Sequence, residues 1–183
     1  MAFVGSPGVV RADLPGAAVR PDELYGTLVW PTSQGHTSAT PASQHVPHDA
    51  SGEELVALTW EALELPGSAM DYHFVLQNAV DRLWGARGSD PAALQLLEVF
   101  ALLDLELMEA APQAVSFDDG DPVSFVRVTS VPRLIGLLER EGAFTEALAL
   151  AQRLTRFEQG QDMVGRLSEK VGALTAEAAA DGT

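Results

Sequence analysis

Residues 134–154, LIGLLEREGAFTEALALAQRL, have the pattern of two short helices folded back against each other. Gly142 lies where the first helix should end, and glycine most readily adopts the left-handed conformation that closes a helix. Phe144 is expected to pack into the elbow, and Ala147 supplies a small side chain where the two backbones come close. Apolar residues at helical spacing complete the hairpin: Leu134, Leu138, Leu150 and Leu154. The segment therefore predicts antiparallel helices, and it specifies no chemistry.

The motif Gly142-x-Phe144-x-x-Ala147 resembles one helical hairpin of the tetratricopeptide repeat family. In that family a small residue ends the first helix, an aromatic residue follows two positions later, and an alanine lies three positions beyond it. The small residue usual in the first helix would fall at Ile135, and the proline that often closes a repeat is missing. The resemblance is confined to residues 134–154 and implies helical hairpins, either stacked in an array or closed into a compact bundle. Elsewhere the chain resembles short bacterial families of unknown function.

Residues 51–183 are expected to form one all-α domain of about six antiparallel helices joined by short turns. Two helix starts have the spacing of a capping box, Ser51 with Glu54 and Ser68 with Asp71. The third helix is apolar on nearly all sides, which indicates that it is the central element. The expected helices cover about residues 51–65, 68–85, 90–110, 130–141, 144–158 and 161–179. Residues 123–128 fit either a short strand or an irregular helical turn.

Residues 1–50 differ from the rest and predict an irregular or disordered tail rich in Pro, Ser and Gly. Prolines recur there at intervals too short for an average helix, and residues 32–44 have the composition of a polar linker. Two apolar patches, residues 3–4 and 28–30, are candidates to dock on the folded domain. Most of this tail is left without assigned structure.

The charge of the chain limits its partners, because 26 Asp and Glu outnumber 11 Lys and Arg and give a net charge of −15. Nucleic acids and anionic membranes are bound through basic residues, so neither is an expected partner. The longest apolar segment, residues 92–111, is interrupted by acidic residues, which favours a buried helix over a membrane span. The lack of cysteine and of a basic, apolar leader predicts a cytoplasmic protein. The excess of arginine over lysine suggests a bacterial source with a GC-rich genome.

Three histidines lie close together in the tail, His36, His45 and His48, beside Asp49. Imidazole is the commonest metal ligand, but this cluster falls in a Pro- and Ser-rich stretch with no cysteine, so a solvated linker is the expected interpretation. The acidic residues of 118–121 lack the alternating spacing and the terminal glutamate of a calcium loop. The sequence therefore predicts no metal and no cofactor.

Asp104 is the most unusual polar residue of the third predicted helix. Helical geometry places it opposite the other acidic residues and among apolar neighbours, where a carboxylate is costly unless it is paired. Arg82, Arg127 and Arg133 are its expected partners, and His73 is expected to lie at the boundary of the core. We favour a structural ion pair over a catalytic acid, since no second catalytic group is directed at Asp104.

These observations favour a non-enzymatic interaction module that binds a protein partner through a groove between helices. Trp60 and Trp84 are candidates to line a groove, although tryptophan in a helix more often belongs to the core. No nucleophile elbow, phosphate-binding loop or paired histidine motif occurs, so no residue is nominated as catalytic. Two alternatives remain. One is a ligand-binding or enzymatic domain with an internal pocket around Asp104 and His73. The other is an acidic inhibitor that captures a basic partner.

Overall fold

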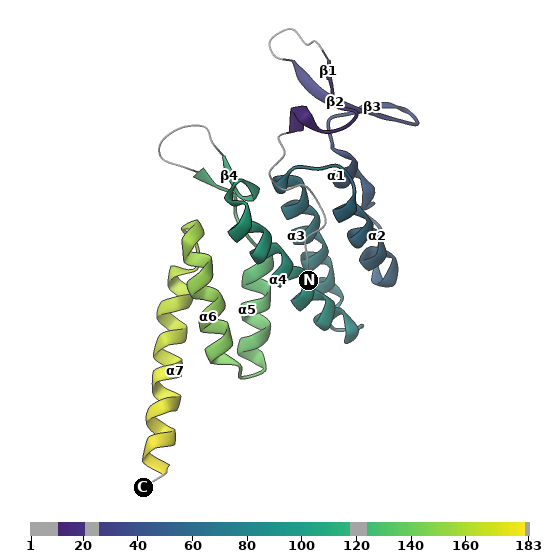
Figure 1. Cartoon of the computed structure of the whole chain (residues 1–183). Helices are drawn as coiled ribbons and strands as arrows, with labels where there is room; N and C mark the ends of the chain where they lie inside the picture. Colours follow the sequence, from purple (N-terminus) through teal and green to yellow (C-terminus); the bar gives the residue numbers. More distant parts are fainter. Residues whose placement is uncertain (1–10, 21–25, 118–123, 182–183) are drawn as a thin grey trace.

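Seven α-helices and two small sheets make up the part of the chain that the computed structural model describes, residues 11–20, 26–117 and 124–181. From α2 to α7 each helix packs against the next, so the helices form a row in chain order (Figure 1). The predicted class, a largely all-α fold behind an irregular N-terminal segment, is confirmed. The elements are β1 (Ala18–Arg20), β2 (Thr27–Thr32), β3 (Gly35–Thr37), α1 (Pro41–His45), α2 (Gly52–Glu64), α3 (Ala69–Ala86), α4 (Ala92–Ala110), β4 (Ser116–Phe117), β5 (Ser124–Phe125), α5 (Ser130–Arg140), α6 (Phe144–Leu154) and α7 (Gln161–Asp181).

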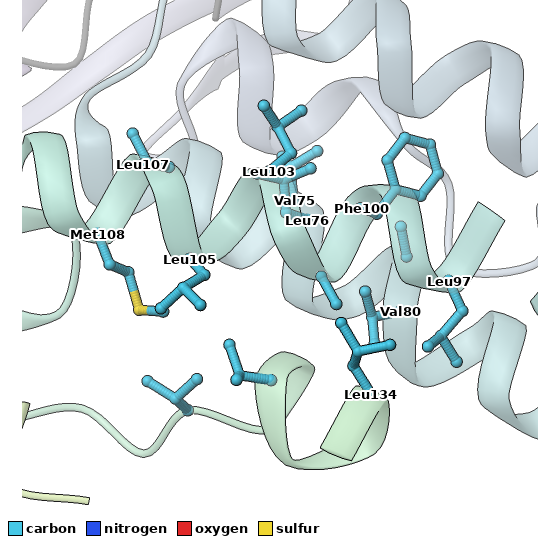
Figure 2. Close-up of a cluster of buried hydrophobic side chains, with 14 of the residues drawn as sticks. Val75, Leu76, Val80, Leu97, Phe100, Leu103, Leu105, Leu107, Met108 and Leu134 are labelled. Carbon is cyan, nitrogen blue, oxygen red and sulfur yellow. The ribbon is translucent and has the colours of Figure 1, made fainter. Parts of the chain in front are cut away.

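The core centres on α4, which packs against both α3 and α5, and α3 and α5 also contact each other. Each large apolar side chain buried there contributes about 1.5–3 kcal/mol by leaving water, so the contact of α3 with α4 is a main source of stability. No helix in the described ranges is long and apolar enough to cross a bilayer. Figure 2 shows part of this cluster: Val75, Leu76 and Val80 of α3, Leu97, Phe100, Leu105 and Met108 of α4, and Leu134 of α5.

The hairpin of α5 and α6 closes through Gly142, whose φ of +79° is left-handed. The Ala143 N–H donates to the Leu138 carbonyl at 2.8 Å, and the Gly142 N–H donates to the Glu139 carbonyl at 3.3 Å. These are the two bonds of a Schellman motif, which satisfies carbonyls that the helix end would otherwise leave unpaired. Phe144 begins α6 and packs against the core. The other residues predicted to form the hairpin are buried or half-buried: Leu134, Leu138, Ala147, Leu150 and Leu154.

Replacing Gly142 by alanine should lower the free energy of unfolding by about 1 kcal/mol, because a side chain raises the energy of the left-handed conformation. Gly136, inside α5, provides the matched control. Neither site has a heavy atom within 4 Å of an added Cβ, so the two variants differ in backbone conformation and not in steric fit. Gly136→Ala should raise stability by about 0.5–1 kcal/mol. Denaturant unfolding measures both, and equal effects of the same sign would contradict the account of this turn.

The two predicted capping boxes have different outcomes. At α3 the box is present: the Ser68 hydroxyl accepts from the Asp71 N–H, and the Asp71 carboxylate accepts from the Ser68 N–H at 2.8 Å. At α2 the prediction is wrong, since Ser51 is the N-cap but its side chain makes no cap hydrogen bond. Gly52 follows with a φ of +55°, so the first turn of α2 lacks the helical backbone geometry on which a capping box depends.

The N-terminal segment contains more regular structure than the sequence indicates. The strands β1, β2 and β3 form an antiparallel sheet, and Trp30 of β2 is 1% exposed. The short helix α1 packs against α2 and α3, and the Ala42 N–H donates to the Pro66 carbonyl at 3.1 Å. These strands are only three to six residues long, and Pro31 lies inside one of them. Apolar and polar residues therefore do not alternate clearly enough for the strands to be predicted from the sequence.

Asp71 fastens the N-terminal segment to α3. Its carboxylate accepts hydrogen bonds from Arg11 at 2.9 Å and from the Ser43 hydroxyl at 2.8 Å, in addition to those from Ser68. Burial opposes ionisation of Asp71, but the hydrogen bonds from Arg11, Ser68 and Ser43 outweigh burial and hold the pKa of this carboxyl below its ordinary value of 3.8. The ionised carboxylate therefore stabilises the attachment of residues 11–43 to the helices.

A lowered pKa in the folded state means that Asp71 adds stability above its ordinary pKa and loses this contribution as the pH falls through the lowered value. Asp71→Asn should reduce the free energy of unfolding at neutral pH by about 1–2 kcal/mol. The deficit should shrink in acid, where the wild-type carboxyl is also protonated. Urea unfolding of both proteins across the acidic range measures it, and a deficit that grows on acidification would refute this role.

The sequence of residues 123–128 fits either a short strand or an irregular helical turn. The described part of this segment begins with a strand. Ser124–Phe125 form β5, which pairs antiparallel with Ser116–Phe117 of β4. The backbone from Val126 to Thr129 has no regular structure before α5 begins. Val123 and the acidic residues of 118–121 lie outside the described ranges.

Candidate functional site

Asp104 of α4 is completely buried and belongs to a network that joins three helices. One carboxylate oxygen lies 2.7 Å from Nδ1 of His73 on α3. The other accepts a hydrogen bond from the hydroxyl of Ser130, the first residue of α5. Both partners are also completely buried. The network therefore links α3, α4 and α5 at a point that water does not reach.

The expectation of an arginine partner for Asp104 is wrong. Arg82 donates to the backbone carbonyl of Pro47 at 2.9 Å, and Arg133 donates to Asp81 at 3.2 Å. Arg127 is exposed. A guanidinium group inside the core would itself need desolvation and several acceptors, whereas an imidazole and a hydroxyl satisfy both oxygens of Asp104 within little space. The expectation that His73 lies at the boundary is wrong as well, because it is completely buried.

The geometry of the network does not match a nucleophilic triad. In such a triad the histidine lies between the serine and the acid and accepts the serine proton. Here the Ser130 hydroxyl donates to Asp104 directly, and His73 Nε2 has no hydrogen-bond partner among the described residues. All three side chains lack exposed surface. The arrangement joins helices and offers no reactive group to a substrate.

Asp104→Asn should lower the free energy of unfolding by about 2–4 kcal/mol, because an amide cannot accept both hydrogen bonds and leaves a buried donor unsatisfied. Glu98→Gln on the same helix is the control, since Glu98 is exposed and should change stability by less than about 0.5 kcal/mol. Chemical denaturation of the three proteins measures the difference. A stability of Asp104→Asn within about 0.5 kcal/mol of the wild type would show that the network is not a structural link.

A groove of about 760 Å³ is lined by residues of α3, α5, α6 and α7 and of the loops that precede α5 and α7. Most of its helical residues come from α5. Trp84 near the end of α3, Pro132 and Gly136 of α5, and Met163 of α7 give the groove apolar and small surfaces. Its volume falls within the range of roughly 300–1,000 Å³ that is typical of ligand sites.

The charge of the groove is opposite in sign to that of the chain. Its lining includes four basic residues, Arg127, Arg133, Arg140 and Lys170, and one acidic residue, Glu139, although the chain has 26 acidic and 11 basic residues. Glu139 is neutralised by the guanidinium of Arg166. Within the described parts of the chain, Arg127, Arg140 and Lys170 form no ion pair with a carboxylate. Among the described residues, the positive charge of the groove is therefore not balanced by carboxylates.

The backbone on both sides of Arg127 is held by one side chain, Gln159. Its amide oxygen accepts from the Val128 N–H at 2.9 Å, and its amide nitrogen donates to the Val126 carbonyl at 3.0 Å. These bonds replace the backbone pairing that an irregular segment lacks. Arg127 is therefore supported at a fixed place on the rim, although no helix or strand contains it.

Trp84 lines the groove and has three arginine side chains close to its rings. The guanidinium carbons of Arg87, Arg133 and Arg140 lie 4.3, 5.5 and 5.0 Å from the centre of its rings, within the range of cation–π attraction. Of the two tryptophans predicted as candidate groove residues, Trp84 lines this groove. Trp60 instead packs against Phe100, with ring centres 5.0 Å apart.

The three histidines of the N-terminal segment lie in different surroundings. His45 pairs with Glu61 at 2.8 Å, His36 is in β3, and His48 is exposed in the loop after α1. Across the described ranges, no group of three or more His, Cys, Asp or Glu residues is placed to hold a metal ion.

The basic groove was not predicted, although part of its signal is visible in the sequence. Two arginines of α5 flank a glycine at helical spacing: Arg133, Gly136 and Arg140. This spacing places the arginines and the small glycine between them on one side of α5. Arg127 and Lys170 are added by the loop before α5 and by α7, and no local pattern joins them to α5.

Comparison with known proteins found no family model, curated protein or solved structure that matches this chain. The resemblance of residues 134–154 to a tetratricopeptide hairpin therefore stays a prediction. The candidate site rests on the geometry and charge of the groove itself.

Proposed function

We propose that this chain is a non-enzymatic helical interaction module, acting in the cytoplasm, that binds a segment of a partner protein in the groove between α5 and α7. The observation that supports this proposal is the reversal of charge: the groove gathers basic side chains on the surface of a strongly acidic protein. Basic side chains without an ion pair among the described residues, beside a half-buried tryptophan, are typical of surfaces that recognise a partner, where Trp and Arg contribute much of the binding energy.

The two alternatives from the sequence receive less support. An enzymatic pocket around Asp104 and His73 would need a path for substrate, and both residues are completely buried and lie outside the groove lining. An acidic inhibitor of a basic partner would use an acidic cleft, whereas this groove has the opposite sign. Nucleic acid is a poor candidate because the net charge of −15 repels a long polyanion.

The proposal is tested by capture of partners from a lysate of the source organism with two double variants of the full chain. Arg127→Glu with Arg140→Glu reverses the groove, and Arg20→Glu with Arg156→Glu makes the same charge change at exposed positions away from it. A protein retained by the wild type and by the control, but lost from the groove variant, is the expected result. Equal retention by both variants would place the binding surface elsewhere, and an enzymatic turnover abolished by the groove variant would overturn the non-enzymatic assignment.

A further inference from the structure

We infer that the groove binds an acidic segment: a short, extended stretch of a partner protein with Asp or Glu side chains at several positions and an apolar residue among them. This inference rests on the proposed function and specifies the chemistry of the occupant. Its basis is charge complementarity, since three cations of the lining, Arg127, Arg140 and Lys170, form no ion pair with a described carboxylate.

The spacing of the cations favours several anionic groups over one. Arg127 precedes the first turn of α5 and Arg140 is its last residue, so the 11-residue helix separates their backbones by about 15 Å. Lys170 faces the groove from a different helix, α7. Cations at opposite ends of a helix favour anionic groups at separate positions over a single carboxylate or phosphate. An extended chain rises about 3.3 Å per residue, so acidic side chains a few residues apart match this spacing.

The surface between the cations favours an apolar residue in the middle of the segment. Trp84, Pro132 and Met163 are half-buried and line the groove together. Gly136 leaves open space on α5, where nothing lies within 4 Å of the position that a Cβ would take. An apolar side chain can lie in this gap while neighbouring carboxylates pair with arginine, which binds carboxylates through two parallel hydrogen bonds.

The net charge of the whole molecule favours a short acidic peptide over a polynucleotide. With −15 overall, the protein repels a long polyanion along most of its surface, and the attraction is confined to the groove. Salt screens the interaction between charges that lie more than a Debye length apart, about 8 Å at physiological ionic strength. A short segment bound in the groove is therefore screened from most of the remaining acidic surface. A segment that presents only a few charges inside the groove gains the attraction without the repulsion.

The test uses the full chain and two synthetic peptides, Glu-Glu-Leu-Glu-Glu-Leu-Glu-Glu and the same peptide with every Glu replaced by Gln. Binding is measured by calorimetry and by tryptophan fluorescence at low and high salt. We expect the acidic peptide to bind, to lose affinity as salt rises, and to bind the Arg127→Glu/Arg140→Glu variant at least about tenfold more weakly. The Arg20→Glu/Arg156→Glu control should bind within about twofold of the wild type. The fluorescence response should disappear in Trp84→Phe while the calorimetric signal remains.

Equal binding of the Gln peptide, or preference for a single-stranded oligonucleotide over the acidic peptide, would overturn the inference. The two proposals fail in different ways. If the groove variant loses a protein captured by the wild type, but the acidic peptide neither binds nor displaces that protein, the groove binds a partner of another chemistry and only this inference is wrong. If capture is also insensitive to the groove variant, the proposed function is wrong as well.

Discussion

The position of α5 depends on a carboxylate that has no exposed surface. Asp104 can stay buried only while both of its oxygens accept hydrogen bonds, and its two donors come from different helices, His73 of α3 and Ser130 of α5. The start of α5 is fixed further by α3, because Gln77 accepts from the Thr129 N–H at 2.6 Å and Asp81 accepts from the Thr129 hydroxyl at 2.9 Å. Since α5 forms one wall of the groove, the buried network and the binding surface share a structural cause.

The charge distribution follows from which acidic side chains are paired. Glu109 pairs with Arg153 across α4 and α6, and hydrogen bonding to Arg153 holds the pKa of Glu109 below its ordinary value. Glu139 pairs with Arg166 across α5 and α7, and this bond raises the pKa of the Arg166 guanidinium. Pairs that are partly open to solvent add little stability. The pair of Glu139 with Arg166 neutralises the acidic residue of the groove lining, and no described carboxylate pairs with Arg127, Arg140 or Lys170. A locally basic surface can thus exist on a strongly acidic protein.

Local signals in the sequence were sufficient for the helices but not for the site. Gly142 and the pair of Ser68 and Asp71 act within a few residues, so helix ends could be predicted from spacing alone. The capping box at Ser51 failed because Gly52 adopts a conformation that the sequence does not reveal. The sequence places Asp104 on the apolar face of its helix, and this position shows that the carboxylate needs a partner. The identity of the partner depends on how α3 and α5 pack, and His73 is 31 positions away. The groove likewise combines residues from four helices and two loops, of which only α5 shows a pattern.

The most direct test of the account is an amide proton–nitrogen correlation NMR spectrum of the full chain titrated with the acidic peptide. The account predicts that the largest shifts occur at the indole N–H of Trp84 and at the backbone amides of Gly136 and Gly160, all of which line the groove. The indole of Trp30 and the amide of Gly67 are buried at the other end of the row, near α1, and should not move. Shifts spread evenly over the molecule, or centred on Trp30 and Gly67, would contradict a basic groove between α5 and α7 as the binding site.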